Sequence, residues 1–316
     1  MPDKKAVKES RKASALSAKA IDELLSLFDS YGPLEEYTFE ANPENLSDEK
    51  LEVLVKHGVN RISLGVQTLN DTLLKLLNRK HKSGEVLQLI ELIHSFGIHN
   101  ISIDMMYALP YQSVDEFTSH LQTVVQWPIS HISIYSLTIE EHSEFARKHI
   151  EAIDNEIEGE MYEAGVNILE SSGFVRYEVA NFGKPGYSSK HNLSYWNYEE
   201  YYGFGPGAVG FLDGIRYENT QNLMEYFEGE YRKEEEHLTT SDQMFEFIMV
   251  GLRKCEGIAL SDFYNRFQVH IEDIYNEAIE RNIKRYYLEI VDGYLKTTKS
   301  GMQFLHTVLL DFMNDD

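Results

Sequence analysis

The first half of this chain alternates short apolar segments with helix-period segments, and this alternation constrains the fold more than any other feature. The apolar segments at 37–41, 61–66, 98–106 and 131–137 each follow an amphipathic segment, at 15–28, 48–57, 83–96 and 114–125. Because the strands begin roughly 24 to 37 residues apart, each βα unit has the length of a right-handed crossover. The pattern predicts an α/β fold with a parallel sheet. The periodicity of the sequence does not distinguish between two such folds, a piece of a (β/α) barrel and an open doubly wound sheet.

The pattern changes beyond residue 150, which predicts a chain of several parts. Residues 1–14 form a basic leader that we expect to be solvated, 15–150 the α/β part, 151–236 an aromatic and glycine-rich auxiliary region, and 237–316 a C-terminal domain. In the last part, helices at 240–253, 260–267 and 271–283 precede a hairpin centred on Asp292 and Gly293 and a final helix at 301–312. Three helices and a hairpin predict a helical, winged-helix-like domain. Its acidic residues outnumber its basic ones, which favours a structural or docking role over DNA binding.

The composition excludes several classes of protein. The 316 residues hold 52 acidic and 29 basic side chains, and the net charge of -23 disfavours binding to phosphate backbones, so no nucleic-acid partner is expected. No apolar run approaches the roughly 20 residues of a membrane span, and the N-terminus lacks the apolar core of a secretory signal, which predicts a cytoplasmic protein. The single cysteine, Cys255, excludes an internal disulfide and an iron–sulfur cluster held by thiolates of these residues alone.

Polar residues occur late in four successive predicted strands. Glu40, Gln67, Asp104 and Ser136 occupy these positions, and ligands of parallel sheets bind beyond the carboxyl ends of the strands. The pattern fits a polar small-molecule pocket, and it equally fits a set of strand-end caps and loop hydrogen bonds. Arg79 follows Gln67 and either clamps a carboxylate or belongs to a solvated basic face.

A second candidate group lies in the auxiliary region. His191 stands in the segment KHNLSYW beside Tyr195 and Trp196. The histidine is either a structural residue or a ligand, and the aromatic rings either stack on a flat ligand or fill a core. We find no phosphate loop, HExxH or GxSxG motif, and no paired histidines at metal-ligand spacing. Catalytic residues and metal ligands therefore stay unassigned.

Several segments carry a family resemblance that spans nearly everything after the leader. They are FEANP (39–43), RISLGVQTLN (61–70), LNRKH (77–81), DMMYALPYQ (104–112), YEVANFGKPGYSSKHNLSYW (177–196), GFGPGA (203–208) and EFIMVGLRKCEGI (246–258). With these segments the chain resembles the radical S-adenosylmethionine proteins related to oxygen-independent coproporphyrinogen III oxidase. The run at 177–208 is the most specific, and it favours the haem-chaperone branch of that family over the oxidase.

The resemblance implies a partial radical-SAM (β/α) barrel, an auxiliary region and a C-terminal helical domain. It implies S-adenosylmethionine and a [4Fe–4S] cluster as cofactors, haem or porphyrin as the bound molecule, and a haem-acceptor protein as a partner. The implied S-adenosylmethionine contacts are Glu40, Gln67, Arg79, Asp104 and Ser136, and the implied haem-linked residues are His191, Tyr195 and Trp196.

The sequence departs from the family at its beginning. The family's C-x-x-x-C-x-x-C motif and its GGGTP-like loop are absent, and the resemblance begins near residues 13–17. We therefore expect an incomplete barrel that lacks its first two strands, and no radical chemistry by this chain alone. The alternatives are a haem chaperone encoded incompletely, a haem carrier without radical chemistry, an oxidase-type oxidoreductase, a non-functional gene fragment, and an unrelated α/β sugar-phosphate enzyme. The run at 177–208 argues against the last.

Overall fold

The computed structural model describes residues 14–140, 144–147 and 150–313, which divide into two compact units. The sheet unit comprises the described residues within 14–176 together with Ala180–Ser188, and the C-terminal unit comprises Tyr177–Val179 and 189–313. Most of the predicted leader lies outside the described residues. Its last residue, Ser14, is buried rather than solvated, and its carbonyl oxygen accepts a hydrogen bond from Lys50 Nζ at 2.9 Å.

A six-stranded sheet in the order β1-β2-β3-β4-β6-β5 organises the sheet unit. Its strands are β1 (Thr38–Ala41), β2 (Arg61–Gln67), β3 (Asn100–Tyr107), β4 (His131–Ser136), β5 (Val175–Arg176) and β6 (Asn181–Gly183). The first four pair in parallel, as predicted, and β6 and β5 join by antiparallel pairing. The sheet is open rather than a closed barrel, with β1 at one edge of the described strands. The two added strands have two and three residues, which is too short for a periodic signal.

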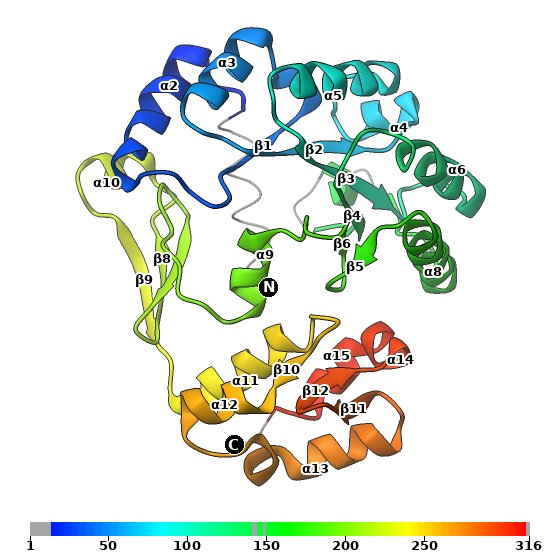
Figure 1. The fold of residues 1–316 in the computed structure, drawn as a ribbon, viewed down its shortest axis with the longest axis vertical. Helices are drawn as coiled ribbons and strands as arrows, with labels where there is room; N and C mark the ends of the chain where they lie inside the picture. The colour runs from blue at the N-terminus through cyan, green and yellow to red at the C-terminus, as the bar shows by residue number, and fades with distance from the viewer. Residues whose placement is uncertain (1–13, 141–143, 148–149, 314–316) are drawn as a thin grey trace. The chain divides into compact units, whose positions relative to one another are not determined.

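Helices cover one face of this sheet (Figure 1). They are α2 (Ala18–Ser26), α3 (Asp48–Lys56), α4 (Asp71–Leu76), α5 (Val86–Ser95), α6 (Val114–Val124) and α8 (Asn155–Ser171); α7 (Glu144–Arg147) and the 3-10 turns η1 (Asp29–Tyr31), η2 (Pro43–Asn45) and η3 (Ser83–Glu85) lie in the connections. Ser47 and Ser113 cap α3 and α6 by accepting hydrogen bonds from the backbone N–H three residues on. The sequence predicts both caps, because each serine directly precedes a helix-period segment, the position at which serine is favoured as an N-cap.

The strands separate an apolar face from a polar one. In β2, Ile62, Leu64 and Val66 are buried in the hydrophobic core, while Ser63 and Gln67 take the alternate positions. The same alternation in β3 and β4 gives the helix-covered face an aliphatic core. It leaves polar side chains on the opposite, inner face. Three of the four strand-end residues of the sequence pattern, Glu40, Gln67 and Asp104, lie on this inner face.

The C-terminal unit contains two small antiparallel sheets and several helices. Its elements are α9 (Lys190–Trp196), β7 (Val209–Leu212), β8 (Ile215–Asn219), α10 (Leu223–Phe227), β9 (Arg232–His237), α11 (Thr240–Gly251), β10 (Ile258–Ala259), α12 (Leu260–Phe267), α13 (Ile271–Lys284), β11 (Leu288–Val291), β12 (Tyr294–Thr297), α14 (Lys299–Gln303) and α15 (Leu305–Leu310). The predicted hairpin is confirmed, because β11 and β12 pair across Asp292 and Gly293. The single helix predicted at 301–312 is wrong: the backbone breaks at Phe304 and leaves two short helices.

The division between the units differs from the predicted segments. The helix α8 and the strands β5 and β6 lie within 151–236, yet they belong to the sheet unit, whereas the rest of that region belongs with the C-terminal helices. Strand pairing explains this, since β6 continues the sheet beside β4. No helix within the described ranges is long and apolar enough to cross a membrane.

Candidate functional site

Three of the predicted strand residues share the inner face of the sheet. Glu40 lies in β1 opposite Ser63 of β2, and Asp104 lies two positions after Ser102 in β3. Ser63 Oγ donates a hydrogen bond to Asp104 Oδ1 at 3.3 Å, which ties adjacent strands together on this face. Glu40 and Asp104 are both half-buried. Two carboxyl groups therefore stand on one partly open polar surface.

The backbone is distorted where β2 ends, and the distortion directs Gln67 into this face. The register of β2 and β3 shifts between Leu64 and Gln67, and Gln67 has a positive φ of 69°. Such conformations in a non-glycine residue persist only where the surroundings impose them, and they are concentrated at functional sites. The Tyr135 hydroxyl donates to Gln67 Oε1 at 3.2 Å, while Gln67 Nε2 is buried and has no hydrogen-bond partner among the described residues. The amide is thus oriented with a donor to spare.

Side chains from two loops converge beside Gln67, over Gly65. A Cβ atom built on Gly65 would lie 2.7 Å from Gln67 Nε2 and 3.3 Å from Asn42 Oδ1. It would also lie 3.7 Å from Nη1 of Arg79, which itself donates a hydrogen bond to Asn42 Oδ1. Arg79 is half-buried, whereas its neighbour Lys80 is exposed. The solvated basic face given as one alternative for Arg79 therefore applies to its neighbours Lys80 and Lys82, which are both exposed, and not to Arg79.

A buried histidine fixes the same two loops. His81 Nε2 lies 3.3 Å from the carbonyl oxygen of Val66, and its Nδ1 lies 3.0 Å from Glu44 Oε2. Because a carbonyl only accepts, Nε2 carries a proton and donates it. Burial raises the pKa of Glu44, but the hydrogen bond from His81, the charge of His81 and backbone hydrogen bonds together outweigh burial, so the net pKa of this carboxyl is lowered. The loop after β1 and the loop after α4 are thereby held at the end of β2.

A second, buried hydrogen-bond contact joins β3 and β4 on the inner face, two residues before Asp104 in β3. Ser102 Oγ and His131 Nδ1 are 2.8 Å apart, and both residues are fully buried. Burial, assisted by the nearby Arg61 charge, lowers the pKa of His131 well below its ordinary value. This histidine is therefore neutral at physiological pH, and it adds no charge to the buried part of the inner face.

The structure does not bring Ser136 to this group. Ser136 pairs in register with Tyr107, whose ring packs against Phe117 on the helix-covered face, and the two side chains are hydrogen-bonded. Its neighbour Tyr135 faces inward instead. The sequence analysis missed Tyr135 and Asn42. The alternation of side chains along β4 could have identified Tyr135, because Ser136 lies on the same face of the strand as the apolar Ile134 and Tyr135 lies on the other.

This inner-face cluster, made of Glu40, Asn42, Gln67, Arg79, Asp104 and Tyr135, combines carboxylates, an amide donor and a guanidinium. Carboxylates accept hydrogen bonds from the hydroxyl groups of a sugar, and an oriented amide pairs with the edge of a heterocycle. The chemistry suits an uncharged polar molecule such as a nucleoside.

The candidate residues of the C-terminal unit lie on α9, which Ser189 caps. His191 is exposed, and its ring stands edge-on to Tyr195 with 4.8 Å between the centroids. Tyr195 in turn packs edge-on against Tyr201 at 4.6 Å. Trp196 is buried, and the guanidinium carbon of Arg253 lies 4.6 Å from the centroid of its ring. The structure therefore brings His191 and Tyr195 together on one side of the helix and separates Trp196 from them.

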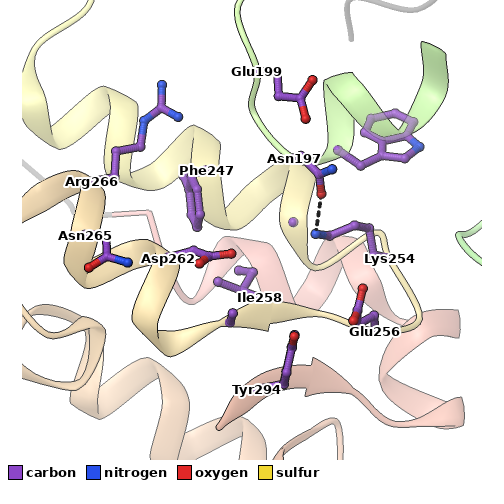
Figure 2. Close-up of a pocket in the computed structure, with 13 residues that line it drawn as sticks. Asn197, Glu199, Phe247, Lys254, Glu256, Ile258, Asp262, Asn265, Arg266 and Tyr294 are labelled. Atoms are coloured by element: carbon purple, nitrogen blue, oxygen red, sulfur yellow. Dashed lines mark hydrogen bonds between the residues drawn. The ribbon is translucent and has the colours of Figure 1, made fainter. Parts of the chain in front are cut away.

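A cavity of about 530 Å³ lies within the C-terminal unit, with Trp196 in its wall (Figure 2). Its charged lining residues are Glu199, Lys254, Glu256, Asp262 and Arg266. Lys254 Nζ donates to Asn197 Oδ1 at 2.7 Å, the contact drawn in Figure 2, and burial lowers the pKa of this lysine. So polar a lining does not suit the apolar faces of a porphyrin.

The single thiol belongs to the C-terminal unit, whereas the inner-face cluster belongs to the sheet unit. Cys255 is half-buried in the C-terminal unit, and its backbone N–H donates to the carbonyl oxygen of Tyr177 at 3.0 Å. In the part of the chain that the structure describes, no three His, Cys, Asp or Glu side chains are grouped so that they could hold a metal ion.

Comparison with known proteins identifies related families. Residues 7–124 match the model of the Radical SAM superfamily, and residues 238–304 match that of the HemN C-terminal domain. "Heme chaperone HemW" of Lactococcus lactis is 38% identical over 313 residues, which cover 96% of this chain and 83% of that protein. "Heme chaperone HemW" of Bacillus subtilis is 36% identical, covering 78% and 68%, and that of Escherichia coli is 31% identical, covering 95% and 81%.

The fold has a counterpart among solved structures. Coproporphyrinogen III oxidase (HemN) from Escherichia coli, a radical SAM enzyme, superposes with a TM-score of 0.81 over 94% of this chain and 74% of that one. The sequence identity is 17%, so this likeness supports the fold alone.

Proposed function

Because the chain belongs to the Heme chaperone HemW family of radical SAM proteins, we propose that it binds haem through α9 and passes it to an acceptor protein. We propose further that the inner-face cluster binds the nucleoside part of S-adenosylmethionine. The observation that carries the first proposal is the exposed His191 held edge-on to Tyr195.

An exposed histidine on a short helix suits a carrier better than a permanent haem protein. The imidazole approaches an iron from solvent, and Tyr195 restricts the rotation of its ring. A site that covers one side of the ligand leaves the other side open to an acceptor. Affinity differences between such related sites arise mainly in the dissociation rate, so a single exposed ligand favours transfer.

The inner-face cluster fits the nucleoside. The amide donor of Gln67 has no protein acceptor within the described ranges, and a buried donor of this kind is costly unless a ligand satisfies it. Glu40 and Asp104 offer acceptors for ribose hydroxyls. When bound, S-adenosylmethionine supplies a sulfonium group, and the residues of this chain hold its nucleoside.

The residues of this sequence do not fit a [4Fe–4S] cluster. Such a cluster requires three or four thiolates, and the 316 residues contain Cys255 alone. The oxidase alternative depends on the likeness to the coproporphyrinogen oxidase, which supports the fold alone. The relatives above 30% identity favour the chaperone.

A haemin titration of the full chain tests the proposal. We expect a shifted Soret band that saturates at one haem per chain. His191→Ala should weaken haem binding by about tenfold or more, because it removes the iron ligand. His237→Ala is the matched control, since His237 is an exposed histidine of the same unit, on β9. Equal affinities of the parent chain and His191→Ala would refute the assignment of the ligand.

A further inference from the structure

The short helix α10, which joins β8 to β9 in the C-terminal unit, presents its apolar side to solvent (Figure 1). Its residues Leu223, Met224 and Phe227 are 58%, 67% and 80% exposed. At 3.6 residues per turn, these three side chains fall within an arc of about 100°, so they form one face of the helix. A surface helix normally turns such a face toward the core. The orientation of α10 is therefore the reverse of the usual one.

Polar contacts hold α10 in this orientation from its other side. Thr220 Oγ1 donates a hydrogen bond to one carboxylate oxygen of Glu225 at 2.6 Å, and Asn222 Nδ2 donates to the other at 2.8 Å. The Tyr226 hydroxyl accepts a hydrogen bond from the backbone N–H of Gly205 at 3.1 Å. Glu225 and Tyr226 lie on the side of the helix away from the apolar face. Specific hydrogen bonds thus fix the direction in which the apolar face points.

Acidic side chains border this apolar face. Glu228 and Glu230 directly follow the helix and are exposed, and neither carboxylate has a hydrogen bond or an ion pair within the described ranges. The segment 218–236 contains seven glutamates but only two basic residues, Arg232 and Lys233, and both of these already lie beside glutamates of the segment. Single exposed apolar residues are ordinary on a protein surface, whereas a contiguous apolar face with a charged border is typical of an association site.

The charge of this border selects the kind of partner. A second copy of this chain would bring the same glutamates against their counterparts, and a membrane surface would bring anionic phosphates. Like charges repel in both cases. A protein segment that carries Lys or Arg beside apolar side chains complements both the apolar face and its border.

We propose that the α10 face, made of Leu223, Met224 and Phe227 with Glu228 and Glu230 at its border, docks a cationic amphipathic helix of a partner protein. The apolar side chains of that helix cover the three exposed ones, and its basic side chains lie beside the two glutamates. Phe227 is the anchor, because it is the most exposed of the three and aromatic side chains dominate the energetics of such contacts. Identifying this partner with the haem acceptor rests on the proposed function, whereas the docking face itself does not.

A labelled peptide tests the proposal on the full chain. The probe is a fluorescent helical peptide of about 18 residues, with leucine on one face and lysine on the other. We expect the parent chain to bind it, and Phe227→Ser to weaken binding about tenfold in an anisotropy titration. Tyr286→Ser is the matched control, because Tyr286 is an exposed aromatic residue of the same unit outside this face, and it should bind as the parent does.

A second variant tests the acidic border. The double substitution Glu228→Gln and Glu230→Gln keeps the apolar face and removes two charges, so it should weaken binding about threefold at low ionic strength. This difference should shrink as salt is added, because exposed charges are screened. If Phe227→Ser does not fold, this double variant decides the question: affinity equal to that of the parent at low salt overturns the docking face.

The remaining outcomes separate the docking face from its competitors. Equal binding by the parent chain and a folded Phe227→Ser overturns the proposal, and so does a parent chain that does not bind the peptide. A dimer that light scattering detects in the parent but not in Phe227→Ser overturns it in favour of a second copy. Sedimentation with phosphatidylserine vesicles that Phe227→Ser abolishes overturns it in favour of a membrane. A parent chain that binds the peptide but no haemin overturns the proposed function and leaves the docking face.

Discussion

The inner face of the sheet and the helix α9 hold their candidate residues in opposite ways. On the sheet, the cluster comes from four strands and two loops, and Tyr135, Gln67, Asn42 and Arg79 orient one another through hydrogen bonds or close contact. On α9, one exposed histidine relies on a ring contact with its neighbour in the same helix. The first arrangement is preorganised for a ligand that stays, and the second suits a cargo that leaves.

The largest expected effect is a substitution that destabilises the C-terminal unit and leaves the stability of the sheet unit unchanged. Gly301 lies within α14, and a Cβ there would lie 1.8 Å from the carbonyl oxygen of Tyr287. Gly301→Ala should therefore lower the free energy of unfolding of the C-terminal unit by about 3 kcal/mol, since backbone must move to accept the methyl group. Urea unfolding checks this by fluorescence, because Trp127 reports on the sheet unit and Trp196 on the C-terminal unit.

Gly159→Ala is the control for that experiment. Gly159 lies in α8, and a Cβ there would meet nothing within 4 Å, so helix propensity should stabilise this variant by about 0.5–1 kcal/mol. An unchanged Trp196 transition in Gly301→Ala would contradict the first expectation.

A smaller effect tests the preorganisation of the inner face. Tyr135→Phe removes the hydrogen bond that orients the Gln67 amide, and it should weaken binding of S-adenosylhomocysteine about fivefold, the loss expected for one hydrogen bond worth about 1 kcal/mol. Isothermal titration calorimetry measures the affinity. Tyr37→Phe is the matched control, because the Tyr37 hydroxyl is buried with no partner in the described residues, and its loss should change little. Equal losses in both variants would show that Tyr135 does not position Gln67.

The smallest effect concerns the pH dependence of the sheet unit. His57 joins α3 to the preceding segment, with Nδ1 2.8 Å from Asp29 Oδ1 and Nε2 2.7 Å from Asp22 Oδ1. The hydrogen bonds to Asp29 and Asp22 raise the pKa of His57 above its ordinary value. A raised folded-state pKa contributes stability that is full below the unfolded pKa of about 6.5 and is lost as pH rises through the folded pKa.

The unfolding midpoint of the sheet unit should therefore fall as pH rises above about 6.5, and Trp127 fluorescence in urea follows it. His57→Gln should remove this slope, because glutamine does not titrate. A slope that persists in His57→Gln would assign the dependence to other groups.

Features that depend on residues close together in the sequence could be predicted without the structure. The parallel strands, the serine caps Ser47 and Ser113, and the Asp292–Gly293 hairpin depend on residues near one another in the chain, and each was predicted from the sequence. Family resemblance supplied the candidate residues, because their motifs are local strings. The fold class and the family are confirmed by the comparisons.

Features that depend on contacts between residues far apart in the sequence could not be predicted in this way. The final helix breaks at Phe304, and the sheet gains β5 and β6, because packing and pairing with remote segments override short local patterns. Proximity to a strand end grouped Ser136 with Gln67, whereas alternation along β4 turns it to the opposite face.

The sequence by itself determined the fold class, the helix caps and the hairpin, because these depend on short-range periodicity and on local cap and turn residues. Only the tertiary structure decided that Tyr135 reaches Gln67, that Asn42 meets Arg79 over Gly65, and that Arg253 lies on Trp196. The reason is physical: these contacts join segments that are 37 to 68 residues apart, and no local preference encodes which of many polar side chains will meet once the chain is packed.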